Sequence, residues 1–415
     1  MRKNQILITI GNFVYLLSQW ALTIVVVRLS TDFYIAGLLG LAMTVANIFF
    51  IIASYGLRSY QVSDVQHVYS DQNYILSRLI TVPISIICCL CYTFAKGYTG
   101  ESVLVIILYM VYKALEAASD VLYGIMQQHN QYNKICWSMS IKGVFSLLAF
   151  TGILAMGLSI SIAMISMIIV AILTLILMDI RWCSSLTHPL LCFKADNAKQ
   201  TGRLLFIASP MVILSIAQPL LMSIPRLYYE HHFSTELLGI YSSLSSPTIA
   251  ITTLVSCALM PYIPLFAQFF LEGNKKDLLR LTFLAVGLTC AFGLVSYIIA
   301  GIIGSWVLSL LYGSAVSGYT NVFQLIIIVS TLSSINMCLI VVFTAIRKLI
   351  PQSIILLLGC LICYLITPSI VTTYAMEGVT YSLIIAQLFQ ITIALIFAVF
   401  YIQKIKQTSK TIESE

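Results

Sequence analysis

Charged side chains are scarce in this sequence of 415 residues. Asp, Glu, Lys and Arg make up 9% of it, and hydrophobic residues make up 60%. Soluble globular proteins carry about a quarter of their residues as these four charged types. The net charge of +7 comes from basic residues scattered between apolar runs, so they form no patch for nucleic acid. These shortages exclude a soluble enzyme and a nucleic-acid-binding domain, and they predict an integral membrane protein.

The sequence also lacks the spacing of a metal site or a disulfide framework. Most of the eleven cysteines lie inside apolar runs, where a free thiol packs as a small hydrophobic group. Cys360 and Cys363 form a Cys-x-x-Cys pair, but no second pair or histidine accompanies them. We therefore predict no metal, no cofactor and no catalytic residue. The apolar run after Met1 is long enough to span and stay, so no cleavable signal peptide is expected.

Twelve runs are long and apolar enough to cross a membrane as α-helices, which takes roughly 20 residues each. The predicted spans are 5–29, 34–56, 75–95, 102–125, 135–156, 160–180, 204–229, 236–262, 281–303, 320–346, 352–373 and 377–402. The predicted fold is an all-α integral membrane protein with about twelve transmembrane helices. The longest outer segment, 304–319, is apolar and is expected to dip into the membrane interface.

Basic residues indicate the orientation of these spans. If the N-terminus is cytoplasmic, eighteen of the 22 Lys and Arg fall on the cytoplasmic side, Arg78 and Lys142 among them, and three fall outside. The positive-inside rule predicts such a bias for one orientation only. Both termini are therefore predicted to be cytoplasmic.

A weak internal repeat divides the chain into halves. Arg28 precedes the triplet Leu38-Leu39-Gly40, and Arg226 precedes Leu237-Leu238-Gly239, at an offset of 198 or 199 residues. Parallel repeats place two bundles around an axis along the membrane normal, with the substrate path between them. The sequence predicts two six-helix lobes related by a pseudo-two-fold axis along the membrane normal. The predicted lobes are 1–181 and 204–403, with a cytoplasmic linker at 182–203 and a cytoplasmic tail at 404–415.

The fourth span carries the densest set of charges in the predicted membrane region. Lys113, Glu116 and Asp120 lie within about 60° of one another on one helix face. Intramembrane charges are costly and are functional candidates by default. One interpretation is a cavity wall on which Lys113 attracts an anion and a carboxylate exchanges protons. The other is a self-neutralising Lys113–Glu116 pair that holds the span against a neighbouring helix.

Arginines near helix ends form a second group of candidates. Arg28 ends the first span, whose polar stripe consists of Asn12, Tyr15, Gln19 and Thr23. On a straight helix Arg28 lies about 140° from Thr23, so the stripe does not carry it to the same wall. Arg58, at the inner end of the second span, fits a substrate contact and a topology charge equally well. Arginines at such places also extend ordinarily to the lipid headgroups.

The seventh span combines polar residues with prolines. Gln218 and Arg226 lie on one stripe, and Glu230 follows Arg226 by one turn. Pro219 and Pro225 each remove a backbone hydrogen bond, so this span is expected to be bent or broken and to act as a gate.

Several motifs resemble the Wzx-type polysaccharide-repeat flippases of the multidrug/oligosaccharidyl-lipid/polysaccharide exporter superfamily. They are Asn12-x-x-Tyr15-x-x-x-Gln19-Trp20, Val27-Arg28-Leu29, Gly37, the run from Gly56 to Asp64, and Ile224-Pro225-Arg226-Leu227 followed by the run from Leu238 to Ser242. The resemblance covers the whole length of the chain.

The resemblance implies alternating access by two six-helix lobes in the bacterial inner membrane. The substrate it implies is an oligosaccharide linked by pyrophosphate to a polyprenol, and Arg28, Arg58 and Arg226 match the basic residues that line the family's cavity. Arginine suits a pyrophosphate because its planar fork binds phosphate oxygens in pairs. Proton or sodium coupling and contact with polysaccharide polymerase machinery are plausible for such a protein.

Other functions are open at the sequence level. A multidrug exporter of the same superfamily would share the fold and carry a smaller, more aromatic pocket. A facilitator-superfamily sugar transporter is disfavoured, because the segment 56–78 lacks the Gly-x-x-x-Asp-Arg-x-Gly-Arg loop of those proteins. A polysaccharide polymerase or ligase is disfavoured by the short outer loops.

Overall fold

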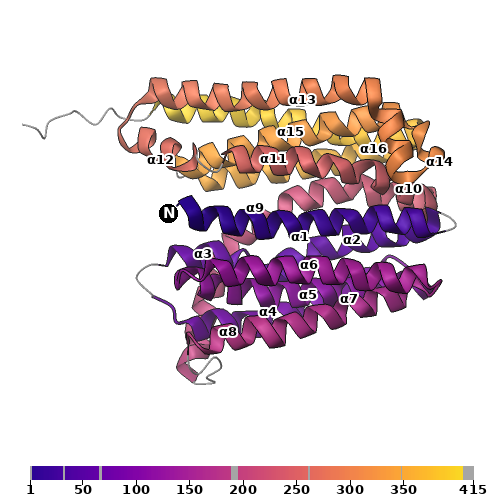
Figure 1. Cartoon of the computed structure of the whole chain (residues 1–415). Helices are drawn as coiled ribbons and strands as arrows, with labels where there is room; N and C mark the ends of the chain where they lie inside the picture. Colours follow the sequence, from indigo (N-terminus) through magenta and orange to yellow (C-terminus); the bar gives the residue numbers. More distant parts are fainter. Residues whose placement is uncertain are drawn as a thin grey trace, which may run out of the picture. The chain divides into compact units, whose positions relative to one another are not determined.

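The computed structural model describes residues 2–30, 33–64, 68–187, 195–259, 262–346 and 348–404. These residues are almost entirely helical and include no strand (Figure 1). The elements are α1 (Arg2–Leu29), α2 (Phe33–Ser54), α3 (Leu57–Ser63), α4 (Asp71–Ala95), α5 (Gly100–Gln128), α6 (Tyr132–Ala155), α7 (Ile160–Thr174), the π-helix η1 (Leu175–Ile180), α8 (Arg181–Ser184), α9 (Ala195–His232), α10 (Thr235–Ser245), the 3-10 turn η2 (Ser246–Thr248), α11 (Ile249–Leu259), α12 (Ile263–Leu271), α13 (Lys275–Tyr312), α14 (Ser314–Ser317), α15 (Thr320–Ala345) and α16 (Leu349–Gln403).

Ten stretches of helix in the described part of the chain are long and apolar enough to cross a membrane. Seven of them match predicted spans to within four residues at either end: α1, α2, α4, α5, α6, α15 and the α7–α8 stretch. The prediction of an all-α integral membrane protein is confirmed.

The last two predicted spans, 352–373 and 377–402, form one continuous stretch that turns back on itself. Within α16, Ala375 has φ 47° and ψ −121°, which is not helical. Across this point the Gln390 side-chain amide donates to the carbonyl of Leu356 at 2.9 Å. A Cβ on Gly378 would lie 2.5 Å from the carbonyl oxygen of Ile370. The two arms therefore pack as an antiparallel helical hairpin, as two separate spans would.

The seventh predicted span, 204–229, lies within α9, a helix of 38 residues. This helix is not among the ten candidates found in the described residues. It continues through Pro219 and Pro225, so the span is not broken there, and the alternative expectation of a bend stays a prediction. A proline can remain in a long helix when neighbouring groups satisfy the carbonyl that it leaves without a donor.

Two predicted segments differ in detail from the structure. The predicted span 236–262 is largely matched by Thr235–Ser256, one of the ten stretches that can cross a membrane, but the turn η2, which contains Pro247, separates α10 from α11 within it. Proline clashes with the preceding helical turn, which accounts for the interruption. The predicted outer segment 304–319 is mostly helix, because α13 extends to Tyr312 and α14 follows it. Its apolar residues and small residues pack as helix instead of forming a loop.

The chain forms two compact units. Unit 1 comprises 1–223 and 233–243, and unit 2 comprises 224–232 and 244–415. The boundary therefore passes through α9 and again through α10. The predicted lobe limits at 181 and 204 stay a prediction, and 188–194 in the linker and 405–415 in the tail lie outside the described residues.

One helix is central to each unit. In unit 1, α5 packs against α2, α3, α4, α6 and α7. In unit 2, α15 packs against α11, α12, α13 and α16. Polar groups that are buried on either helix therefore need a partner within the protein.

The glycines of the repeated triplets bring α2 and α10 into close contact within unit 1. A Cβ on Gly37 would lie 1.9 Å from the carbonyl oxygen of Thr235, and one on Gly239 would lie 2.3 Å from that of Phe33. A Cβ on Gly40 would lie 2.4 Å from the hydroxyl of Ser242. Only residues without a side chain allow two helix backbones to approach this closely. The sequence repeat therefore coincides with a packing site.

Candidate functional site

The functional candidates of unit 1 gather along one face of α5. Its polar side chains recur every three or four residues, so they fall on a single stripe. They are Tyr109, Tyr112, Lys113, Glu116, Ser119, Asp120 and Tyr123. Because α5 is the central helix, this stripe meets polar side chains from α1, α3, α4, α6 and η1. Three clusters result.

The first cluster, called here the Glu116 cluster, consists of Tyr15, Gln19, Tyr112, Lys113 and Glu116. Lys113 Nζ lies 2.7 Å from Glu116 Oε2, and the Tyr15 hydroxyl donates to the same oxygen at 2.8 Å. The Gln19 amide donates to the Tyr112 hydroxyl at 3.1 Å. The Tyr15 and Tyr112 hydroxyls are 3.3 Å apart. Two residues of the polar stripe on α1 are thus joined to the charges of α5.

The ion pair of the Glu116 cluster matches one of the two interpretations offered by the sequence. Lys113 is 8% exposed and its charge is neutralised by Glu116, as a structural pair requires. Its ammonium also lies 5.2 Å from the ring centre of Phe50 and 5.9 Å from that of Tyr109. The Glu116 side chain remains 22% exposed, so its carboxylate is partly accessible. A role of either residue in substrate binding or ion coupling stays a prediction.

The second cluster, the Asp120 cluster, contains more positive than negative charge. Arg58 Nη1 lies 3.2 Å from Asp120 Oδ1, and Arg78 Nη2 lies 3.6 Å from Asp120 Oδ2. Arg58 also donates to the Gln127 amide oxygen at 3.3 Å, and Arg78 donates to the carbonyl of Ala53 at 3.2 Å. Two guanidinium groups share one carboxylate, so the cluster carries a net charge of about +1.

Exposure separates the two arginines of the Asp120 cluster. The Arg78 side chain is 4% exposed, whereas Arg58 and Asp120 are 23% and 24% exposed. Arg78 therefore holds Asp120 from the inside, and Arg58 presents the accessible positive charge. The arrangement can bind an anion at Arg58, because a guanidinium that shares its carboxylate has donors to offer.

The third cluster is fully enclosed. Lys142 on α6 and Asp179 in η1 lie 3.6 Å apart, and they are 2% and 0% exposed. Lys142 also donates to the Tyr123 hydroxyl at 3.2 Å, and Ser138 donates to Asp179 at 2.5 Å. Asp179 lies in a π-helical turn, a distortion that is frequent at functional sites.

The sequence did not predict this third cluster. Lys142 and Arg78 were counted among the cytoplasmic charges, and that side stays a prediction, but both residues are buried with charged partners on other helices. The positive-inside rule uses only the position of a charge along the chain, so it does not detect a partner on another helix. Asp179 was the available signal, because it is an acidic residue inside the predicted span 160–180.

The remaining predicted residues lie elsewhere. Arg28 is exposed in the last turn of α1, nine residues after Gln19. Arg226 is partly buried and Glu230 is 9% exposed, and both belong to the segment of α9 in unit 2. Gln218 and Pro219 are partly buried in the unit 1 portion of α9, and Pro225 is buried in its unit 2 portion. Their predicted roles are not decided by this placement.

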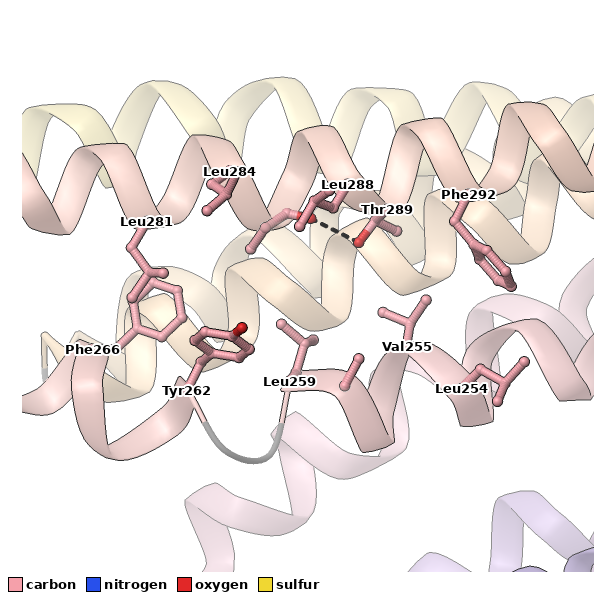
Figure 2. A pocket seen from close by; sticks show the side chains of 12 residues that line it. Leu254, Val255, Leu259, Tyr262, Phe266, Leu281, Leu284, Leu288, Thr289 and Phe292 are labelled. Atoms are coloured by element: carbon pink, nitrogen blue, oxygen red, sulfur yellow. Dashed lines mark hydrogen bonds between the residues drawn. The ribbon is translucent and has the colours of Figure 1, made fainter.

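Unit 2 contains a cavity of about 360 Å³ that the sequence did not predict. Figure 2 shows side chains of α13 along one wall and those of α11 along the other, with Tyr262 and Phe266 at one end. The lining residues are Leu254, Val255, Ala258, Leu259, Tyr262, Phe266, Leu281, Leu284, Ala285, Leu288, Thr289 and Phe292. None of them is charged, and the Thr289 hydroxyl donates to the carbonyl of Ala285 at 2.8 Å. The cavity suits an apolar group.

Metal chemistry has no candidate site in the described part of the chain, which holds no group of three His, Cys, Asp or Glu side chains suited to a metal ion.

The comparisons with known proteins show the family. The family model described as "Polysaccharide biosynthesis protein" matches residues 1–270. The chain belongs to this family.

A relative of this polysaccharide biosynthesis family member is the capsular polysaccharide biosynthesis protein CapF of Staphylococcus aureus. The two are 24% identical over 327 residues, which cover 79% of this chain and 81% of the relative.

The fold of this family member is similar to that of solved multidrug transporters. An inward-facing multidrug transporter of the MATE family is similar with a TM-score of 0.69 and 17% identity, and covers 95% of this chain and 96% of its own. The outward-facing form has a TM-score of 0.65 and 15% identity, with coverage of 97% and 95%. A superfamily transporter from Pyrococcus furiosus, whose binding pocket is described as reversed in polarity, has a TM-score of 0.57 and 15% identity, with coverage of 97% and 95%.

Proposed function

We propose that this protein is a flippase that moves polyprenyl-pyrophosphate-linked oligosaccharide repeat units from the inner to the outer leaflet of the bacterial plasma membrane. The observation that carries the proposal is the accessible surplus of positive charge at the Asp120 cluster, inside a member of the polysaccharide biosynthesis family with a transporter fold. Both termini are cytoplasmic in this proposal, and transport proceeds by alternating access.

Arg58 is the proposed contact for the pyrophosphate. Phosphate oxygens accept paired hydrogen bonds from a guanidinium, which are about twice as strong as neutral hydrogen bonds. Asp120 orients Arg58, and the buried Arg78 supplies a second positive charge that offsets the charge of Asp120. Arg28 and Arg226 are proposed as further contacts, with Gln19, Gln218 and Glu230 supplying polar surface around them.

The Glu116 cluster is the proposed site of proton or sodium coupling. Its carboxylate is partly exposed and accepts from both Lys113 and Tyr15, so protonation of Glu116 would release two donors at once. Such an exchange changes how α5 is held against α1. Protonation is thereby linked to helix packing within unit 1.

Helix α9 is the proposed gating element. It passes from unit 1 to unit 2 after Ser223, and Pro219 and Pro225 lie on either side of that point. Proline has no backbone N–H to donate within a helix, and we expect this to make α9 easier to bend near the point where the chain passes from unit 1 to unit 2.

Depletion of the protein from cells tests the proposed function directly. We expect an inward-facing lipid-linked oligosaccharide to accumulate, measured by extraction and mass spectrometry, and polymer at the cell surface to fall. Purified protein in liposomes should then deliver the same lipid to the outer leaflet. Glycan chains that grow longer in those liposomes would instead identify a polymerase.

Arg58→Gln tests the anion contact within the same assay. Losing a charge-assisted hydrogen bond of about 1.5–3 kcal/mol should lower transport about tenfold or more at normal membrane abundance. Arg203→Gln, at an exposed position of α9, is the matched control. Equal transport by both variants would remove Arg58 from the substrate path.

A multidrug exporter is the second candidate, and the apolar cavity of unit 2 is the observation that favours it. An exporter of hydrophobic cations would make depleted cells more sensitive to such drugs without accumulation of any glycolipid. Susceptibility and lipid analysis in the same depleted cells separate the two functions.

A further inference from the structure

We propose that the apolar cavity of unit 2 holds part of the isoprenoid tail of an anionic carrier lipid, with its phosphates bound by Lys276 and Arg280 at the start of α13. This inference deepens the proposed function and rests on it for the identity of the substrate. It is carried by the shape of the cavity and by the charges at one end of it.

The cavity is open to the surroundings along its length and closed behind. Leu254, Leu284 and Leu288 are 53%, 52% and 62% exposed, whereas Leu259 and Phe266 are 6% and 1% exposed (Figure 2). The lining is therefore a groove with a buried floor and an apolar rim. Because α13 is among the candidate membrane helices, hydrocarbon is the natural occupant of this groove.

One stripe of α13 joins positive charge to this groove. Lys276, Arg280, Leu284 and Leu288 follow one another at intervals of four residues and so lie along one side of the helix. Lys276 and Arg280 are both exposed. The two cations thus lie within one or two turns of the groove, where they meet the headgroup of a lipid whose tail lies in it.

Among the described residues, the nearby carboxylates Asp277 and Glu272 form hydrogen bonds with neutral amides and no ion pair with these cations. Asp277 accepts from the Asn274 side-chain amide at 2.6 Å, and Glu272 accepts from the Gln268 amide at 2.8 Å. The sequence predicts this end of α13 to be cytoplasmic, because the basic residues collect there. A lipid held here would enter from the inner leaflet, the side from which the proposed transport begins.

The groove is limited in size, with a cavity of about 360 Å³ between α11 and α13. It therefore takes only a segment of a long lipid chain, and the headgroup has to lie outside it. Two neighbouring cations also match a pyrophosphate better than a single phosphodiester.

Selectivity has to come from the headgroup, because lipid tails are as apolar as the groove and gain little by leaving the bilayer. Removing the cations should therefore abolish the preference for the carrier lipid even when the groove is intact. Filling the groove should instead displace the tail from α11 and α13 even when the cations are intact. These two kinds of variant test the two parts of the site independently.

The experiment uses the purified full-length chain in phosphatidylethanolamine nanodiscs. The probe is a polyprenyl pyrophosphate without sugar that carries a photoreactive group in its tail, and cross-linked peptides are identified by mass spectrometry. We expect labelling to concentrate in 249–259 and 281–292. It should fall about tenfold both in Leu288→Trp and in the double variant Lys276→Gln/Arg280→Gln.

Two variants serve as matched controls. Ile302→Trp places the same bulk at a 74% exposed position of α13 outside the groove, and Arg203→Gln removes an exposed cation of unit 1. Both should label like the wild type. Labelling spread evenly over lipid-facing helices would overturn the inference, and so would competition by unlabelled phosphatidylglycerol as strong as that by unlabelled polyprenyl pyrophosphate.

The liposome transport assay separates this inference from the proposed function. Transport of the oligosaccharide lipid without labelling of the groove would overturn the groove alone. Labelling of the groove without transport would support the groove and count against the flippase.

Discussion

The central helices of the two units, α5 and α15, satisfy their polar side chains with different kinds of contact. Helix α5 carries charges and meets them with ion pairs, as in Lys113–Glu116 and Arg58–Asp120. Helix α15 contains no charged residue. Its hydroxyls donate to carbonyls one turn back in the same helix, as Thr331 does to Ile327 at 2.8 Å.

Contacts between helices differ in the same way. Asn336 of α15 donates to Gln390 at 3.2 Å, and Gln387 donates to Ser333 at 2.9 Å. These neutral pairs hold α15 to α16 without a buried charge. We therefore expect anion binding to act on the packing of α5, whose contacts are charged, and not on that of α15, whose contacts are neutral.

The largest expected effect is at the enclosed ion pair. Asp179→Ala leaves Lys142 buried without its carboxylate, and breaking such a pair costs about 3–5 kcal/mol. We expect a marked loss of folded protein in membranes and a lower unfolding temperature in detergent. The double variant Lys142→Met/Asp179→Leu should regain most of that stability, because apolar residues of similar volume often replace a buried pair without loss. A double variant as unstable as Asp179→Ala would contradict a purely electrostatic account.

The next effect distinguishes the two interpretations of the Glu116 cluster. Lys113→Ala leaves Glu116 without its ammonium, and we expect a cost of about 1–3 kcal/mol. If the pair is only structural, Lys113→Leu/Glu116→Leu should harm transport less than Lys113→Ala. Equal loss of transport in both, at matched abundance, would favour the cavity interpretation.

Arg226→Ala examines a charge of unit 2 that lies on α9 and not on the central helix α15. Arg226 is partly buried and lies three residues after the point where the chain passes from unit 1 to unit 2. If it contacts the substrate, its loss should lower flipping about tenfold at normal membrane abundance. The readout is the amount of polymer at the cell surface. Unchanged polymer would refute a substrate role for Arg226.

The smallest effect is expected at the neutral central helix. Asn336→Leu removes one hydrogen bond between membrane helices, for which about 0.6 kcal/mol is typical. Unfolding in detergent should shift slightly and transport should not change. A loss comparable with that of Lys113→Ala would show that α15 is as responsive as α5 and would undo the contrast between the units.

Composition alone predicted much of the fold. Seven spans fall within four residues of their helices, because a bilayer imposes the same length and apolarity on every crossing. Composition did not show how prolines act within the spans: Pro247 lies in a turn that interrupts the helix in one of them, whereas α9 continues through Pro219 and Pro225. A proline in a sequence does not reveal whether its neighbours satisfy the carbonyl that it leaves.

The candidate site was likewise predicted only in part. Lys113, Glu116 and Asp120 were predicted to share a face because helical periodicity places them there, and they do line one stripe of α5. The sequence did not pair Asp120 with Arg78 or Lys142 with Asp179. These partners lie on other helices, and no periodicity connects them.

The sequence by itself determined that this chain is a helical membrane protein and that charge lies on one face of its fourth span. Local rules are sufficient for these features, because hydrophobicity, helix period and topology charges act over one or two turns. Tertiary structure alone decided which cations are neutralised, which remain available, and where an apolar groove opens in unit 2. Those properties depend on distances between side chains of different helices, since the energy of a charge in an apolar bundle is set by its partner and not by its own neighbours in the chain.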